Sequence, residues 1–150
     1  MIKAGDKAPA FSLVSGDGTM VSLKDFKGKK IVLYFYPKDN TSGCTREACS
    51  FQENLSALKE MGAVLLGVSA DDVSSHARFA TKYDLSFPLL SDEKKEILKA
   101  YGVWNEKSMY GRKYMGIERT TFVIDERGTI AHVFMKVKVE GHVKEVLDVL

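Results

Sequence analysis

The residues of this sequence best suited to chemistry are two thiols, Cys44 and Cys49, the only cysteines among its 150 residues. Cys44 lies where we expect the opening turn of a helix that directly follows a buried strand. Unpaired N–H groups at a helix start carry partial positive charge, which favours a thiolate over a thiol whose free pKa is about 8.5. Cys44 is therefore a candidate nucleophile. For Cys49, the residues alone leave open the common alternative of a small buried apolar side chain.

The spacing of the two cysteines constrains how they could react with each other. Five residues of α-helix rise about 7.5 Å and turn through about 500°, which places the two Cα atoms roughly 8.6 Å apart. A disulfide seldom spans Cα atoms more than about 7 Å apart. If Cys44 and Cys49 join, the helix between them must unwind, so the protein would alternate between a folded and a locally melted form.

The segments around Cys44 predict a β-α-β unit. Residues 31–36 form a continuous apolar run, typical of a strand buried on both faces of a parallel sheet, and Pro37 ends it. A single helix is expected from about residue 42 to 61, closed by Gly62, and residues 64–68 form a second buried strand. The apolar stripe of that helix is Ala48, Phe51, Leu55 and Leu58.

The rest of the chain predicts an α/β sandwich in one domain, residues 1–150, with no linker or internal repeat. Residues 24–30 are predicted as a solvated loop. Strands 120–124 and 130–137, joined by a turn at 125–128, predict an antiparallel hairpin with its second strand at a sheet edge. The other expected elements are a leading hairpin (11–21), helices near 73–80 and 93–101, and a closing helix (143–150).

Composition excludes several classes of function. Lysine and arginine total 22 against 20 acidic residues, interspersed along the chain, so the net charge of +2 gives no reason to expect a nucleic acid partner. No run approaches the roughly 18 apolar residues of a membrane span, and the first residues lack the pattern of a secretory signal, so a cytoplasmic protein is expected. His76, His132 and His142 show no ligand spacing. We predict ordinary surface or sheet positions for them and no metal site.

The segment Tyr36-Pro37-Lys38-Asp39-Asn40-Thr41-Ser42-Gly43-Cys44 resembles the peroxiredoxin active-site motif, in which three residues separate a proline from a threonine and two separate that threonine from a cysteine. Because Cys49 follows Cys44 by five positions, the chain resembles the peroxiredoxin Q or bacterioferritin comigratory protein branch. Residues 5–11, 87–92 and 116–125 agree with other landmarks of this branch. The resemblance therefore covers nearly the whole chain, without a departure at any position that the motif requires.

This resemblance implies a thioredoxin-like fold, a central mixed β-sheet flanked by helices, with an N-terminal β-hairpin. It places the strand that starts near Thr120 antiparallel to residues 31–36, with Arg119 beside Cys44 to stabilise the thiolate and the breaking peroxide bond. Without the motif, Arg119 would be taken for a surface residue. It also implies that Thr41 holds thiolate and peroxide in line and that Pro37 shields the pocket. The alternative role of Thr41 is a helix N-cap, and that of Pro37 is to end the strand.

Glu47, one turn beyond Cys44, could orient Arg119 or remain a solvated acid in the first helical turn. The activity implied by the family is reduction of hydroperoxides by Cys44, condensation of its sulfenic acid with Cys49, and reduction of the disulfide by thioredoxin or a similar dithiol donor. No metal, haem or flavin is implied, since sulfur carries both electrons. A monomer is expected, with a weak homodimer as the alternative.

Two other functions remain open from the residues. A thiol–disulfide oxidoreductase of thioredoxin type is disfavoured because the cysteines are not spaced C-x-x-C and Thr120, instead of a proline, starts the strand that faces them. The second is a non-catalytic binding module or holdase with incidental thiols. Consumption of hydrogen peroxide separates the first from a peroxidase, and a Cys44→Ser variant separates the second.

Overall fold

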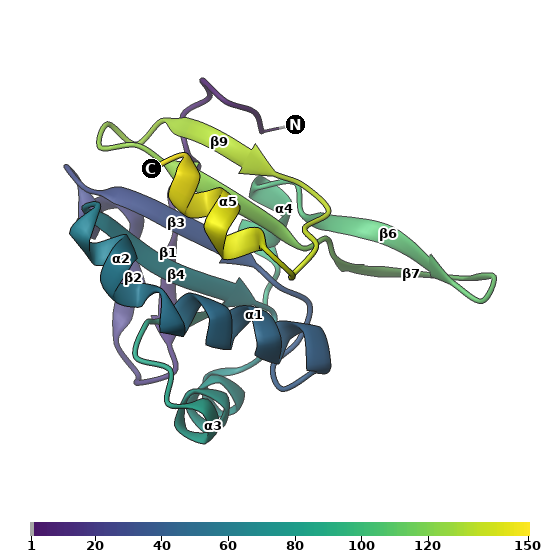
Figure 1. Cartoon of the computed structure of the whole chain (residues 1–150). Coiled ribbons are helices and arrows are strands. Elements are labelled where there is room, and N and C mark those ends of the chain that lie inside the picture. The colour runs from purple at the N-terminus through teal and green to yellow at the C-terminus, as the bar shows by residue number, and fades with distance from the viewer. Residues whose placement is uncertain (1) are drawn as a thin grey trace.

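The computed structural model describes residues 2–150 and contains one large mixed β-sheet (Figure 1). Its strands are β1 (Ser12–Ser15), β2 (Met20–Ser22), β3 (Lys30–Phe35), β4 (Ala63–Ser69), β5 (Leu89–Ser91), β8 (Thr120–Ile124) and β9 (Ile130–Phe134). The spatial order is β2-β1-β5-β4-β3-β8-β9. β3 is parallel to β4 and β4 to β5, and the remaining pairs are antiparallel.

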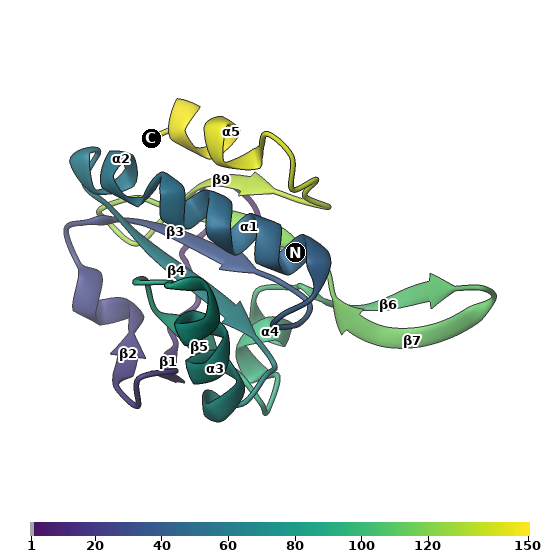
Figure 2. The same cartoon turned by 60° about the horizontal axis from the view of Figure 1, so that its bottom comes forward.

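Helices cover both faces of this sheet, as the two views show (Figures 1 and 2). They are η1 (Leu23–Phe26), α1 (Ser42–Glu53), α2 (Leu55–Glu60), α3 (Val73–Tyr83), α4 (Glu96–Ala100) and α5 (His142–Asp148). Buried side chains of α1, α2, α3 and α5 share one core cluster, and α4 and η1 pack into a second cluster across the sheet. None of the helices within residues 2–150 combines the length and apolarity that a bilayer crossing requires.

The strand β3 lies inside the sheet between β4 and β8. Its side chains alternate between the two cores, with Val32 and Tyr34 in one and Ile31, Leu33 and Phe35 in the other. Each cluster removes apolar surface from water on its own side, which is why the run shows no polar alternation. The predicted central strand, its parallel neighbour and the β8–β9 hairpin at the edge are confirmed, although β9 ends at Phe134 and not at residue 137.

The helix predicted for residues 42–61 is divided in two. The apolar stripe is buried as expected. Asn54, however, is both the C-cap of α1 and the N-cap of α2, because its backbone (φ −105°, ψ 10°) departs from helical values. The Asn54 side-chain amide donates to the carbonyl of Ser50 at 2.8 Å and competes with the backbone ladder. Gly62, with φ of 76°, follows α2 in the left-handed conformation that ends helices.

Three other elements differ from the sequence-based expectation. A second, two-stranded sheet of β6 (Trp104–Met109) and β7 (Arg112–Ile117) projects from the body of the molecule (Figure 2). The stretch predicted as a loop at 24–30 begins instead with η1, at whose start the backbone N–H of Ser22 donates to the Asp25 carboxylate at 2.9 Å. The helix expected at 93–101 is confined to α4. The leading hairpin is confirmed as β1 and β2.

Candidate active site

Cys44 is the third residue of α1 and lies at the carboxyl end of β3. The chain leaves β3 at Phe35, passes Pro37, and enters the helix at Thr41, whose extended backbone (φ −92°, ψ 158°) makes it the N-cap. The Cys44 thiol is a free thiol and is only 2% exposed. It lies in the first turn of a twelve-residue helix, at the end that carries partial positive charge.

Arg119 reaches the sulfur from the neighbouring strand. Residues Phe35 of β3 and Thr120 of β8 are paired in antiparallel register, so Arg119, one residue before β8, lies at the same end of the sheet as Cys44. Its Nη2 donates to Cys44 Sγ at 3.2 Å. Gly43 leaves room for this approach, because a Cβ at that position would make a tight contact of 3.3 Å with Arg119 Nη2. The structure thus places a permanently charged donor against the thiol.

Glu47 lies one turn further along α1 and pairs with the same guanidinium. Its Oε1 accepts from Arg119 Nη1 at 2.6 Å, while Oε2 is buried and has no hydrogen-bond partner among the described residues. Burial raises the pKa of Glu47 to about 7, although Arg119 opposes the shift. Burial lowers the pKa of Arg119, but Glu47 and Cys44 outweigh it and the net pKa is raised. Glu47 therefore contacts Arg119 directly and is not a solvated acid.

The hydroxyl of Thr41 donates to the carbonyl of Lys38 at 2.9 Å. Thr41 is therefore the N-cap by backbone position, but its side chain makes no capping hydrogen bond to α1. Pro37 is partly buried at the strand end. The bond to Lys38 closes a short turn and fixes the position of the hydroxyl three residues before the thiol.

Cys49 lies on the same unbroken helix as Cys44, and its free thiol is partly buried. Burial, followed by the charge of Glu53, raises the pKa of Cys49. A thiolate is thus less populated at Cys49 than at an ordinary surface cysteine. With the helix intact, the separation expected from helical geometry keeps the two sulfurs from bonding.

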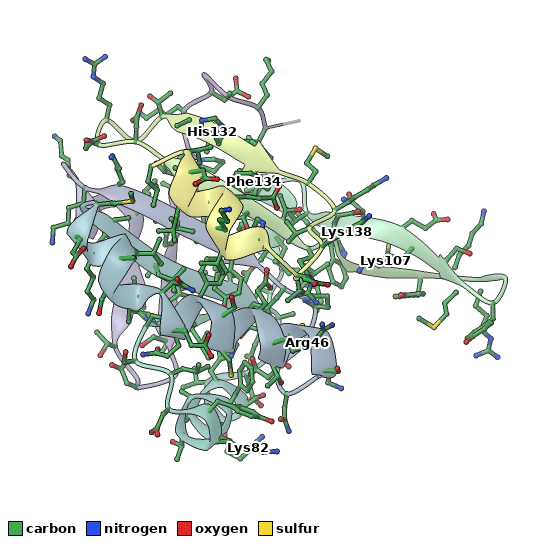
Figure 3. The ribbon with its side chains drawn as sticks, viewed as in Figure 1. Arg46, Lys82, Lys107, His132, Phe134 and Lys138 are labelled. Atoms are coloured by element: carbon green, nitrogen blue, oxygen red, sulfur yellow. The ribbon has the colours of Figure 1, made fainter. Side chains whose placement is uncertain are left out.

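Two of the three histidines are not where the sequence led us to expect. His76 on α3 is 0% exposed and His142 on α5 is 1% exposed, so the prediction of surface or sheet positions is wrong for both. Hydrogen-bond partners inside the protein allow both rings to be buried. His142 Nε2 lies 2.8 Å from the Thr121 hydroxyl, and His76 contacts Asp39. His132 does lie exposed on β9, as expected (Figure 3).

The one group of metal-ligand type within residues 2–150 is Asp39, Asp71 and His76, whose ligand atoms lie within 4.8 Å of one another. Internal hydrogen bonds already engage these atoms. Asp39 accepts from Tyr36, Ser75 and His76, and Asp71 accepts from the backbone N–H of Asp39 and from Ser69. Burial raises the pKa of Asp39, but the hydrogen bonds led by His76 outweigh it and the pKa is lowered. The group forms a hydrogen-bond network beside the active-site loop, which sequence reasoning did not find.

Comparison with known proteins agrees with this geometry. The AhpC/TSA family profile matches residues 4–133. The chain is 47% identical over 149 residues to peroxiredoxin Bcp of Bacillus subtilis, covering 99% of this chain and 95% of that one. Its structure is similar to that of the bacterioferritin comigratory protein of Xanthomonas campestris, with a TM-score of 0.91, 40% identity and coverage of 97% and 95%.

A cysteine mutant of PrxQ from Xylella fastidiosa is similar at a TM-score of 0.94 and 39% identity, with 99% of this chain and 94% of that chain covered. These likenesses extend over the sheet, the helices and the loop that carries Cys44, and they establish the thioredoxin-like fold class. They also support thiol-dependent peroxidase activity. The chain therefore belongs to the AhpC/TSA family, as a peroxiredoxin of the peroxiredoxin Q or bacterioferritin comigratory protein branch.

Proposed function

We propose that this peroxiredoxin reduces hydrogen peroxide and organic hydroperoxides with the Cys44 thiolate. The observation that carries the proposal is the 3.2 Å contact between Arg119 Nη2 and Cys44 Sγ at the start of α1. The thiolate attacks one peroxide oxygen, the O–O bond breaks, and the other oxygen leaves with a proton as water or alcohol. The similarity to the Xanthomonas campestris protein, described for its alkyl peroxide reduction activity, supports organic substrates.

Arg119 stabilises negative charge at two stages of this step. It first favours the thiolate, and then binds the peroxide oxygens as charge moves onto the leaving oxygen. The Thr41 hydroxyl donates its hydrogen bond to the Lys38 carbonyl, so its oxygen lone pairs can accept a hydrogen bond from the peroxide. Pro37 covers the pocket at the strand end and excludes water. Glu47 holds the guanidinium in place from behind.

The sulfenic acid formed on Cys44 condenses with Cys49 in the second step, which releases water and forms an internal disulfide. α1 must unwind for this to happen. Unwinding also returns Cys49 to solvent, which removes the burial that raises its thiol pKa. A dithiol donor of thioredoxin type then reduces the disulfide and becomes oxidised itself. No cofactor is needed in this cycle, and because both thiols belong to one chain, a monomer completes it.

The test of this function is mass spectrometry of the reduced protein after one equivalent of hydrogen peroxide. We expect loss of two hydrogens and a peptide cross-link between Cys44 and Cys49. A Cys49→Ser variant should instead gain one oxygen, at Cys44. Failure of the wild-type protein to react, or oxidation at Cys49 alone, would contradict the proposal.

Local unwinding can be tested at Arg46, an exposed position between the two cysteines (Figure 3). Arg46→Gly and Arg46→Ala remove the same charge, but glycine costs a helix about 1 kcal/mol relative to alanine. If disulfide formation requires the melted helix, the glycine variant should form the disulfide about fivefold faster than the alanine variant. The measurement is the rate of disulfide formation after stoichiometric peroxide. Equal rates would show that unwinding does not control this step.

A further inference from the structure

The loop between β3 and α1 is held by a buried carboxylate at its centre. Asp39, 6% exposed, accepts hydrogen bonds from Tyr36 Oη at 2.5 Å, from Ser75 Oγ at 2.8 Å and from His76 Nδ1 at 2.7 Å. Its backbone N–H donates to Asp71 Oδ2 at 2.8 Å. One residue of the loop is thus tied both to the end of β4 and to α3, which lie outside the site that surrounds the thiol.

The His76 ring completes this network on the α3 side. Nδ1 faces the Asp39 carboxylate and Nε2 lies 3.0 Å from the Leu90 carbonyl oxygen. Nδ1 thus supplies a hydrogen-bond partner to a carboxylate that is nearly buried, and Nε2 faces a carbonyl acceptor. Such partners matter because a carboxylate left without hydrogen bonds inside the protein is costly.

The residues on either side of Asp39 connect the Asp39–His76 pair to the active-site loop. Lys38, which directly precedes Asp39, provides the carbonyl that receives the Thr41 hydroxyl. Asn40, which follows it in the left-handed conformation (φ 60°), accepts from Tyr83 Oη at 3.2 Å, again on α3. The loop is therefore fixed on the α3 side, while Arg119 approaches the sulfur from β8 on the opposite side.

We propose that Asp39 and His76 are positioning residues for peroxide reduction, which set the place of Thr41 and of the α1 start relative to Arg119. The proposal rests on the function proposed above. Neither residue touches the thiol in the structure; they act through the loop. Their role is to keep the Thr41 hydroxyl, the Cys44 sulfur and the Arg119 guanidinium aligned. An error of about 1 Å in this alignment would slow the reaction by up to roughly a hundredfold.

Two substitutions at His76 separate positioning from simple loss of a buried residue. The amide nitrogen of asparagine stands near the place of Nδ1, so His76→Asn keeps the donor to Asp39. The amide nitrogen of glutamine stands near the place of Nε2, so His76→Gln keeps the donor to Leu90 and loses the one to Asp39. Both variants bury one amide and lose one hydrogen bond. Leu98→Ala, in the other core cluster, serves as a destabilised control.

The experiment measures the second-order rate constant for Cys44 oxidation by hydrogen peroxide in a Cys49→Ser background, by rapid quenching, alkylation and mass spectrometry. Thermal unfolding of each variant is recorded beside it. We expect His76→Gln to react at least about tenfold more slowly than the parent, His76→Asn to stay within about threefold, and Leu98→Ala to lose stability without losing rate.

Equal rates for the two His76 variants, or rates that follow thermal stability across all the variants, would overturn the proposal. Should His76→Gln not fold, Tyr36→Phe decides: it removes only the hydroxyl that donates to Asp39, and a parental rate there also overturns the proposal. The peroxidase function and the positioning role are refuted by different results. An unreactive parent protein refutes the peroxidase function, whereas a reactive parent with an unimpaired His76→Gln variant refutes only the positioning role.

Discussion

The Cys44→Ser variant is expected to show no hydroperoxide consumption above background with thioredoxin, thioredoxin reductase and NADPH. A serine hydroxyl stays protonated at neutral pH and cannot supply the two electrons that a thiolate gives to the peroxide, although Arg119 and the helix start remain in place. The assay is steady-state NADPH oxidation with hydrogen peroxide and with an organic hydroperoxide. Undiminished turnover would show that the thiol at 44 is incidental, as a non-catalytic module predicts.

The matched control for this variant is Cys49→Ser, which removes the other thiol from the same helix. It should consume one equivalent of peroxide per chain in a rapid burst and then stop with thioredoxin as donor. The burst separates the two roles, since only the nucleophile is needed for the first oxidation. Continued turnover of this variant would mean that the second thiol comes from outside the chain.

The Arg119→Gln variant is expected to lower the second-order rate constant of Cys44 oxidation by about 10²- to 10³-fold, the usual cost of removing one preorganised donor from a transition state. In the proposed mechanism the loss has two parts, one from the thiolate that Arg119 stabilises and one from the charge that develops on the peroxide oxygens. Ultraviolet absorbance of the thiolate as a function of pH isolates the first part, and the remaining rate difference above the thiol pKa gives the second.

This variant should still fold. Burial already raises the pKa of Glu47 to about 7, so loss of the opposing guanidinium raises it further and the carboxyl becomes neutral at physiological pH. Arg119→Lys should recover only part of the rate, since an ammonium cannot contact Sγ and Glu47 through two nitrogens at once. Arg127→Gln, at an exposed turn, is the control for loss of one positive charge. A rate for Arg119→Gln within threefold of that control would contradict the assigned role.

The elements that position Cys44 could be predicted from the sequence, because the strand is buried on both faces and the helix is buried along one periodic stripe. Residues 31–36 have to be apolar at every position to fill both cores, and the stripe of Ala48, Phe51, Leu55 and Leu58 has to repeat at helical spacing to face one of them. The contact between Arg119 and Cys44 is a different case. The two residues are 75 positions apart, and only the family motif suggested that they meet.

The elements that sequence reasoning missed leave no such pattern. Within residues 2–150, β6 and β7 pair only with each other, and they carry mainly exposed side chains, so no buried face imposes alternation. Their turn is made by Tyr110 and Gly111, both with positive φ, instead of the Asn-Gly or Asp-Gly pair that marks a two-residue hairpin. β5 has three residues, too few to show a period.

Buried histidines are hidden for another reason. In α3 the apolar residues at helical spacing are Val73, Ala77 and Ala80, but the fully buried side chains of the helix are His76 and Phe79. A histidine counts as polar in any hydrophobic pattern, so a pattern cannot reveal one whose nitrogens are both satisfied inside. Asp39 is concealed in the same way, because its partners come from residues 36, 75 and 76.

Both thiols lie on α1, and this arrangement determines how the proposed cycle responds to dilution. A tether of five residues presents Cys49 to the oxidised sulfur at an effective concentration on the order of millimolar, whatever the amount of protein present. Ring closure is then a first-order process, and a scarce enzyme completes it as quickly as an abundant one. A resolving thiol on a separate subunit would instead depend on assembly, and would fail when the protein concentration falls below the dissociation constant of the oligomer.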